Sequence, residues 1–178
     1  RLGDGRGHPF ARLGRPTRAG PRVTEPDGSD DPDRVGAGQR RAGFEAAPQT
    51  WAEWKRSMHA VKRVAGGDAY AILLPLNEFE QLLTFGLQQA EPMLRDRDTR
   101  GNFSSPGFVS ALAFYKSLFD EQLAPLASST QISNVWTEFA RGYFSFYFSG
   151  PWSVGDFRSK LPASFQLNWA TAGVPGPN

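Results

Sequence analysis

Three residues of the sequence combine types and positions that suit the binding of a small polar ligand. Trp152 follows Gly150 and Pro151 at a predicted strand-to-helix corner, where the glycine permits close backbone approach and the proline presets the first helical turn. Asn77 and Glu78 stand between another predicted strand and the helix after it. Open α/β sheets place their ligand sites at such corners. The indole offers a flat apolar face, and the amide and carboxylate oxygens accept hydrogen bonds.

Each of these three residues also has a purely structural interpretation. Trp152 could fill space in the core, which is the commoner fate of tryptophan. Asn77 is placed to cap the helix that follows it, with Glu80 as the return half of a capping box, and Glu78 could only complement the dipole of that helix. An Asn77 oxygen bonded to a backbone N–H has less capacity left for a ligand. The ligand role and the structural role therefore stay open for all three.

Groups that could perform catalysis or hold a metal ion are sparse. The chain has no cysteine, which excludes disulfides, thiolate metal sites and a cysteine nucleophile. Its two histidines, His8 and His59, share no metal-ligand spacing. Glu78 and Glu80 stand two apart at a helix start and point in different directions, so they do not form the carboxylate pair of a glycoside hydrolase. We expect no catalytic residue, no metal site and no cofactor.

Charge and composition divide the chain after Arg41. Residues 1–41 hold nine Arg and no Lys against six acidic residues, together with eight Gly and five Pro. Few large apolar residues are available there to offset the entropy of ordering. The segment is interpreted as a disordered basic tail, a nucleic-acid-binding arm, or sequence outside the native reading frame of its gene. It lacks the aromatic residues on which single strands stack, so we expect no nucleic-acid partner.

Residues 42–178 carry alternating helix and strand patterns, which predict an α/β fold. Capping signals at Thr50 with Glu53, and at Ser105 with Pro106, predict the starts of two helices. The remaining predicted elements are a strand over 69–74, a helix from Asn77, a helix over 133–140, a strand over 143–148 and a strand over 165–174. The other tryptophans are expected in the core, namely Trp51, Trp54, Trp136 and Trp169. No window of 18 apolar residues and no apolar leader occurs, so we expect no membrane span and no signal peptide in this chain.

Five motifs in order resemble the extracellular solute-binding proteins of family 1, which serve carbohydrate ABC importers. The resemblance covers about residues 41–178. The motifs are Ala42-Gly43-Phe44 with Pro48-Gln49-Thr50-Trp51, the helix opened by Asn77-Glu78-Phe79-Glu80, the run FVSALAFYKSL at 108–118, Phe139-Ala140-Arg141-Gly142, and Ser149-Gly150-Pro151-Trp152.

This resemblance implies a fold and a site. Members of the family have two α/β lobes with sugar held between them, so residues 42–178 are expected to form a partial C-terminal lobe of the periplasmic-binding-protein-like type II fold, incomplete and preceded by a disordered segment. Trp152 would stack on a sugar ring, and Asn77 and Glu78 would bind its hydroxyls. The implied partners are a mono- or oligosaccharide and ABC transporter permease subunits. The implied location of the parent family is periplasmic, or extracellular and membrane-anchored.

The expected function is therefore a non-enzymatic carbohydrate-binding component of an ABC sugar importer, present here as a fragment. Two alternatives remain at this point. The chain could be an inactive truncated gene product, because half of a binding cleft loses the surface that normally covers most of a ligand. It could also be a carbohydrate-active enzyme, in which case Glu78→Gln should abolish turnover of an aryl glycoside.

Overall fold

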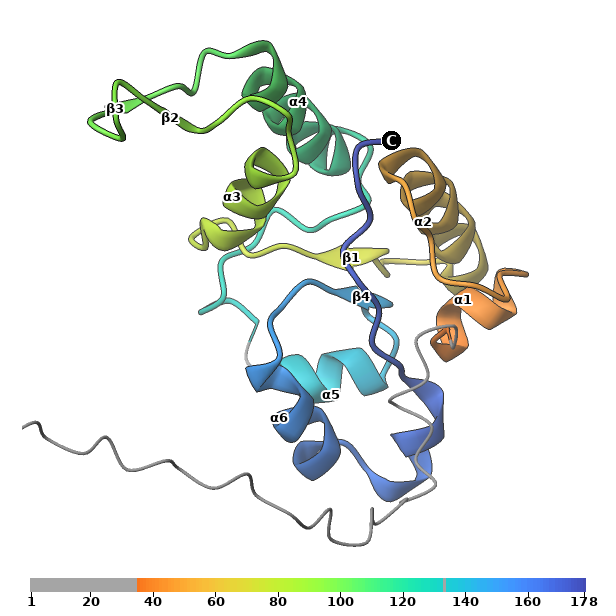
Figure 1. Ribbon diagram of the computed structural model, residues 1–178. Helices are drawn as coiled ribbons and strands as arrows, with labels where there is room; N and C mark the ends of the chain where they lie inside the picture. The colour runs from red at the N-terminus through yellow and green to blue at the C-terminus, as the bar shows by residue number, and fades with distance from the viewer. Residues whose placement is uncertain (1–34, 133) are drawn as a thin grey trace, which may run out of the picture.

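The computed structural model describes residues 35–132 and 134–178, in which helices surround a small central sheet (Figure 1). This arrangement agrees with the predicted α/β class. The elements in chain order are α1 (Ala37–Arg41), α2 (Trp51–Ala65), β1 (Ile72–Leu73), α3 (Glu80–Leu87), β2 (Leu94–Arg95), β3 (Arg100–Gly101), α4 (Pro106–Asp120), α5 (Val135–Ala140), β4 (Phe146–Tyr147), α6 (Trp152–Lys160) and a 3-10 helix (Ala163–Asn168).

The two longest helices begin where their capping residues predict. Thr50 Oγ1 accepts a hydrogen bond of 3.2 Å from the Glu53 backbone N–H, and Glu53 Oε2 accepts one of 3.3 Å from the Thr50 N–H. The bonds from the Gln49 and Thr50 backbones hold the pKa of Glu53 below its ordinary value. At α4, Ser105 Oγ accepts from the Phe108 N–H at 3.3 Å. Each cap satisfies a donor that the first turn leaves free.

The central sheet is a parallel pair of very short strands. β1 pairs with β4, with Ile72 opposite Phe146 and Leu73 opposite Tyr147. The backbone of residues 123–127 also runs beside β1, where its carbonyls accept from Ala71, Ile72 and Leu76. Because the two strands are parallel neighbours, the loops that follow them leave the sheet at the same edge. We call this the carboxyl edge.

Two apolar clusters form the core on either side of this sheet. The larger packs α2, α3 and α4 together, and includes a stacked pair of rings, Trp51 and Phe114, with centroids 4.4 Å apart. The smaller cluster gathers around α5 and α6, with Phe157 and Trp169 at its centre. The core prediction is confirmed for Trp51, Trp54 and Trp169, which are buried. Trp136 is only half-buried and packs against the smaller cluster.

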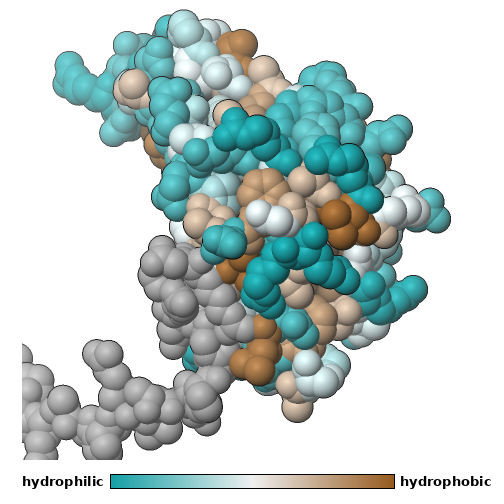
Figure 2. Space-filling model, turned by 90° about the vertical axis from the view of Figure 1, so that its right-hand side faces the viewer, coloured by the Kyte–Doolittle hydropathy of each residue, from teal (hydrophilic) through white to brown (hydrophobic). Residues whose placement is uncertain are grey.

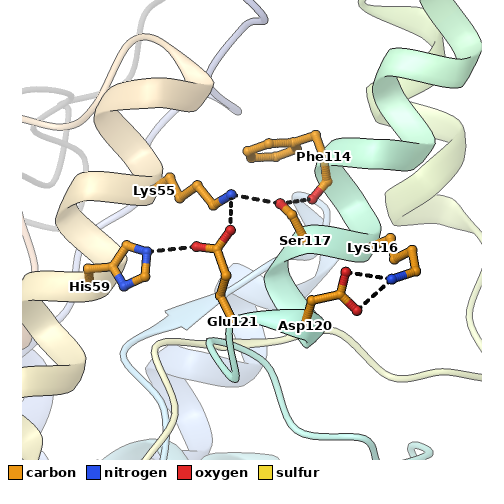
Figure 3. A network of polar contacts seen from close by, with 7 residues as sticks. All are labelled: Lys55, His59, Phe114, Lys116, Ser117, Asp120 and Glu121. Carbon is orange, nitrogen blue, oxygen red and sulfur yellow. Dashed lines mark hydrogen bonds and ion pairs between the residues drawn. The ribbon is translucent and has the colours of Figure 1, made fainter.

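A polar network joins α2 to the end of α4 (Figure 3). The two carboxylate oxygens of Glu121 lie 2.5 Å from Lys55 Nζ and 2.8 Å from His59 Nε2. Lys55 also donates to Ser117 Oγ at 2.9 Å. Burial raises the pKa of Glu121, but the hydrogen bonds and charges of Lys55 and His59 outweigh it and hold the pKa below its ordinary value. The network therefore contains an ionised carboxylate at neutral pH.

Asn77 does not cap the helix that follows it, which corrects the prediction. α3 begins at Glu80 with Phe79 at the capping position. The Asn77 side chain instead binds the loop at Ser129: Oδ1 accepts from the backbone N–H at 2.8 Å, and Nδ2 donates to the hydroxyl at 2.9 Å. The capping interpretation failed because this partner lies 52 residues away and leaves no local sequence signal.

The strand predicted over 165–174 is also wrong. Residues Ala163–Asn168 form a 3-10 helix, and the extended segment after it makes only one isolated bridge, from Gly176 to Thr50. Phe165 and Trp169 both pack against the smaller cluster, and a spacing of four residues suits a helical turn followed by an extended residue. The spacing between Phe165 and Trp169 therefore reflects a helical turn and not the alternation of a strand.

The described structure includes ordered residues before the predicted boundary at Arg41. α1 occupies Ala37–Arg41 and packs against α2. Val35 and Gln39 are buried, and Gln39 Oε1 accepts from the Gly36 N–H at 3.2 Å. The stretch also contacts a distant segment that composition does not reveal, because Arg40 Nη2 donates to the Leu167 carbonyl at 3.4 Å. The interpretations of residues 1–34 lie outside the described residues. Ser133, where the helix over 133–140 is predicted to begin, lies outside them as well. The helix α5 begins at Val135, with Asn134 as its cap. No helix among the described residues is long and apolar enough to cross a membrane.

Candidate functional site

Trp152 stands exposed at the start of α6, on the carboxyl edge of the sheet. Trp152 is 75% exposed, so the alternative that it fills space in the core is wrong. Pro151 precedes it with a helical backbone. The indole folds back over Gly150, where an added Cβ would overlap the six-membered part of the ring. The corner therefore needs glycine at position 150 so that this face of the indole can lie against the backbone while the rest meets solvent.

Asn77 and Glu78 occupy the loop that follows β1, on the same edge. β1 and β4 both end at this edge. Their parallel pairing therefore brings the two following loops to the same edge, although these loops are far apart in the sequence. Asn77 is exposed, but its amide is already bonded to Ser129. Glu78 is partly exposed, and one of its oxygens accepts from Gln81 Nε2 at 3.0 Å. Of the two, Glu78 keeps more capacity for a ligand.

The charge of Glu78 also contributes to the raised pKa values of two phenols. Burial raises the pKa of Tyr115, on α4, and the charge of Glu78 adds to that rise. Burial likewise raises the pKa of Tyr147, on β4; a hydrogen bond with Ser149 opposes the rise, and the charges of Glu78 and Asp156 reinforce it. The Glu78 carboxylate thus acts on residues of two different elements.

Sequence reasoning missed two exposed apolar residues on the same edge. Phe79 is 68% exposed beside Glu78, and Leu126 is 74% exposed on the loop tied to β1. Phe79 precedes the start of α3 at Glu80, and this position outside the helix is the feature that goes with its exposure. Aromatic faces and polar groups are therefore both available at the carboxyl edge. Figure 2 shows the other side of the molecule, which lies to the right in Figure 1 and bears α1 and α2, and there too apolar side chains are set among hydrophilic ones.

The loops of the carboxyl edge carry no positive charge. Residues 75–79, 124–132 and 148–152 include no Lys and no Arg, and Glu78 is their single ionisable side chain. A carboxylate without a neighbouring cation accepts hydrogen bonds from neutral donors and repels anions. The composition of the edge thus suits a neutral, hydroxyl-rich ligand. Among the described residues, no three His, Asp or Glu gather in a way that could hold a metal ion.

A cavity of about 430 Å³ adjoins the Trp152 corner, where Gly150 and Pro151 line it together with residues of β4, α6 and 169–175. Trp152 and Glu78 do not line it. Its walls are mostly apolar, with Phe139, Phe157 and Val174 among them. Such walls leave most hydroxyls of a polar ligand without hydrogen bonds, at a cost in free energy. We therefore place the candidate site at the exposed carboxyl edge and not in this cavity.

Comparison with known proteins found related solved structures. No family model and no curated protein matches the chain. The sugar-binding protein MalE from Xanthomonas citri is 52% identical, with a TM-score of 0.77 over 79% of this chain and 36% of its own. The GacH receptor of Streptomyces glaucescens, solved with acarbose, is 22% identical, with a TM-score of 0.65 over 78% of this chain and 35% of its own. UgpB from Mycobacterium tuberculosis, solved with glycerophosphocholine, is 17% identical, with a TM-score of 0.58 over 71% of this chain and 33% of its own.

These likenesses confirm the predicted type of α/β lobe for the part of the chain they cover. The chain spans about a third of the length of the structures it matches. The two more distant structures share the fold alone, and their ligands differ in chemistry. The matched proteins are binding proteins and not enzymes.

Proposed function

Because the matched residues have the sequence and the fold of part of an extracellular solute-binding protein of family 1, we propose that this chain supplies one wall of a carbohydrate-binding site in an ABC sugar importer. One observation carries the proposal. The parallel pairing of β1 with β4 brings the exposed Trp152 and the partly exposed Glu78 to one edge of the sheet, although they stand far apart in the sequence. The 52% identity to a sugar-binding protein supports it.

The chemistry of the edge matches the two kinds of surface on a sugar. The C–H face of a pyranose ring stacks on the indole of Trp152, which lies against Gly150. Ring hydroxyls donate to Glu78, whose carboxylate is an acceptor only. Asn77 contributes what its bonds to Ser129 leave free, one amide hydrogen and one carbonyl lone pair. Trp152 is therefore the main contact, Glu78 the second and Asn77 the third.

The proposed role is binding without catalysis. Glu78 is engaged by Gln81, while Glu80 accepts from the backbone N–H of Phe79 at 3.1 Å, so each carboxylate has its own use. They do not flank a shared space as the two carboxylates of a glycoside hydrolase do. By the same proposal the parent protein docks on permease subunits, and its location is periplasmic, or extracellular and membrane-anchored.

Quenching of tryptophan fluorescence tests the stacking contact. Trp51, Trp54 and Trp169 are buried, so an aqueous quencher such as acrylamide reaches mainly Trp152. We expect millimolar acarbose, the ligand of the GacH structure, to shield this indole and lower the quenching constant. Trp152→Phe should remove the effect, whereas the half-buried Trp136→Phe should retain it. Equal shielding in the Trp152→Phe variant would contradict the stacking role.

Incubation with a chromogenic aryl maltoside tests the absence of catalysis. We expect no release of the aryl group by the wild-type chain above the rate of the solvent reaction. Release that Glu78→Gln abolishes, with the variant still folded by circular dichroism, would replace the binding proposal with an enzymatic one.

A further inference from the structure

Gln81 is a buried polar side chain that the proposed contacts do not use. It lies in the first turn of α3, and only 2% of its surface is accessible. Its amide nitrogen donates to Glu78 Oε2 at 3.0 Å, and its amide oxygen is buried without a hydrogen-bond partner among the described residues. An apolar side chain of the same size would avoid the cost of that unpaired oxygen. The position therefore carries a penalty that its bond to Glu78 offsets.

The direction of this bond follows from the chemistry of the two groups. A carboxylate has no hydrogen to give at neutral pH, so the amide must turn its N–H group toward it and its oxygen away. The choice of rotamer for Gln81 is also limited, because its side chain is buried on the side of α3 that faces the core. A rigid buried donor thus holds a partly exposed carboxylate by one oxygen. The other oxygen, Oε1, has no hydrogen-bond partner among the described residues and stays available.

We propose that Gln81 is a positioning residue that holds Glu78 by Oε2 so that Oε1 accepts a hydroxyl of the sugar. This role rests on the proposed function. Burying the donor keeps it from exchanging its bond with water, so the carboxylate does not turn away from the edge when a ligand arrives. The carboxylate remains an acceptor, and the site selects ligands that donate hydrogen bonds at this point.

Gln81 is the amide donor to Glu78 among the described residues. The charge of Glu78 contributes to the raised pKa values of Tyr115, on α4, and Tyr147, on β4, so these phenols stay protonated at neutral pH. Asp156, on α6, acts on Tyr147 and is a second negative charge of this region. No Lys or Arg stands in the loops of the carboxyl edge. Removing the Gln81 donor therefore leaves no cation there to take its place.

The test compares three variants of the full chain in binding acarbose, followed by saturation-transfer NMR. Gln81→Met keeps the length of the side chain and removes the donor, and we expect about tenfold weaker binding. Gln81→Glu restores a donor only when its new carboxyl group is protonated. Ser57→Ala is the matched control, because Ser57 Oγ is also buried and without a partner among the described residues but lies on α2.

The pH dependence of the Gln81→Glu variant separates positioning from a purely structural role. Burial and the neighbouring Glu78 charge favour the protonated form of the new carboxyl group, whose O–H then replaces the amide N–H. We expect its affinity to recover toward the wild-type value as the pH falls from 8 to 5, whereas Gln81→Met stays weak throughout. Wild-type affinity in a folded Gln81→Met, or no recovery in Gln81→Glu, would overturn the positioning role and leave the proposed function standing. A wild-type chain that binds no acarbose would overturn both.

Discussion

Gly150 and Trp152 form the most sharply defined contact of the candidate site. An added Cβ at position 150 would overlap the indole, so Gly150→Ala must turn the ring to another rotamer. We expect about tenfold weaker acarbose binding and a changed acrylamide quenching constant, with little change in stability. Gly155→Ala is the control, because its Cβ would meet no atom within 4 Å. That helical substitution should leave binding intact and stabilise the fold by up to about 1 kcal/mol. Equal binding by both variants would contradict a fixed indole.

At the scale of single residues, the sequence indicated the exposed members of the site better than the buried ones. The Gly150-Pro151-Trp152 corner could be predicted because each residue has a conformational reason to stand there. The role of Gln81 could not, because its burial depends on how α3 packs against α4 and the sheet. A glutamine three residues after a glutamate is compatible with many arrangements, and only the coordinates show that one amide is buried against that carboxylate.

At the scale of elements, the network around Glu121 predicts a pH-dependent stability. The pKa of this carboxyl group is lowered on folding, so its stabilisation is present above the ordinary carboxyl pKa and is lost as the pH falls through the lowered value. Glu121→Gln should therefore lower the melting temperature at pH 7. The loss in unfolding free energy should be less than about 1 kcal/mol, because the Glu121 side chain is 36% exposed.

Thermal unfolding at two pH values checks this prediction. The gap between wild type and Glu121→Gln should narrow as the pH falls below the ordinary carboxyl range, because protonation of Glu121 removes its charge. Glu45→Gln removes an exposed carboxylate and should leave the melting temperature unchanged at both pH values. A gap of the same size at neutral and acid pH would mean that shape and not charge joins α2 to α4.

Element starts were predictable where the signal is local, and uncertain where a distant partner decides. Thr50 with Glu53 and Ser105 with Pro106 act within one helical turn, and both helices begin as expected. The strands are shorter than predicted, with two residues each in β1 and β4, because few backbone positions find a partner. Apolar runs report burial and do not report how far the hydrogen-bonded pairing extends.

At the scale of the whole molecule, the class of fold followed from the alternation of elements, while the shape of the site depends on contacts between distant segments. The carboxyl edge exists because β1 and β4 pair in parallel, and no local pattern states that pairing. The structures that the chain matches are about twice as long as the chain. In proteins that enclose a ligand, walls from several sides bury most of its surface. The carboxyl edge is one wall.

A chimera tests whether this wall is competent. Residues 42–178 would replace the matched region of Xanthomonas citri MalE, to which the chain is 52% identical. We expect the chimera to bind a sugar that MalE binds at least about a hundredfold more tightly than the isolated chain does, because a second wall removes more ligand surface from water. Trp152→Ala in the chimera should weaken binding about tenfold or more, since the stacking face is lost. A folded chimera that binds no sugar would show that this wall has lost its ligand contacts, whereas tight binding indifferent to Trp152→Ala would place those contacts elsewhere on the lobe.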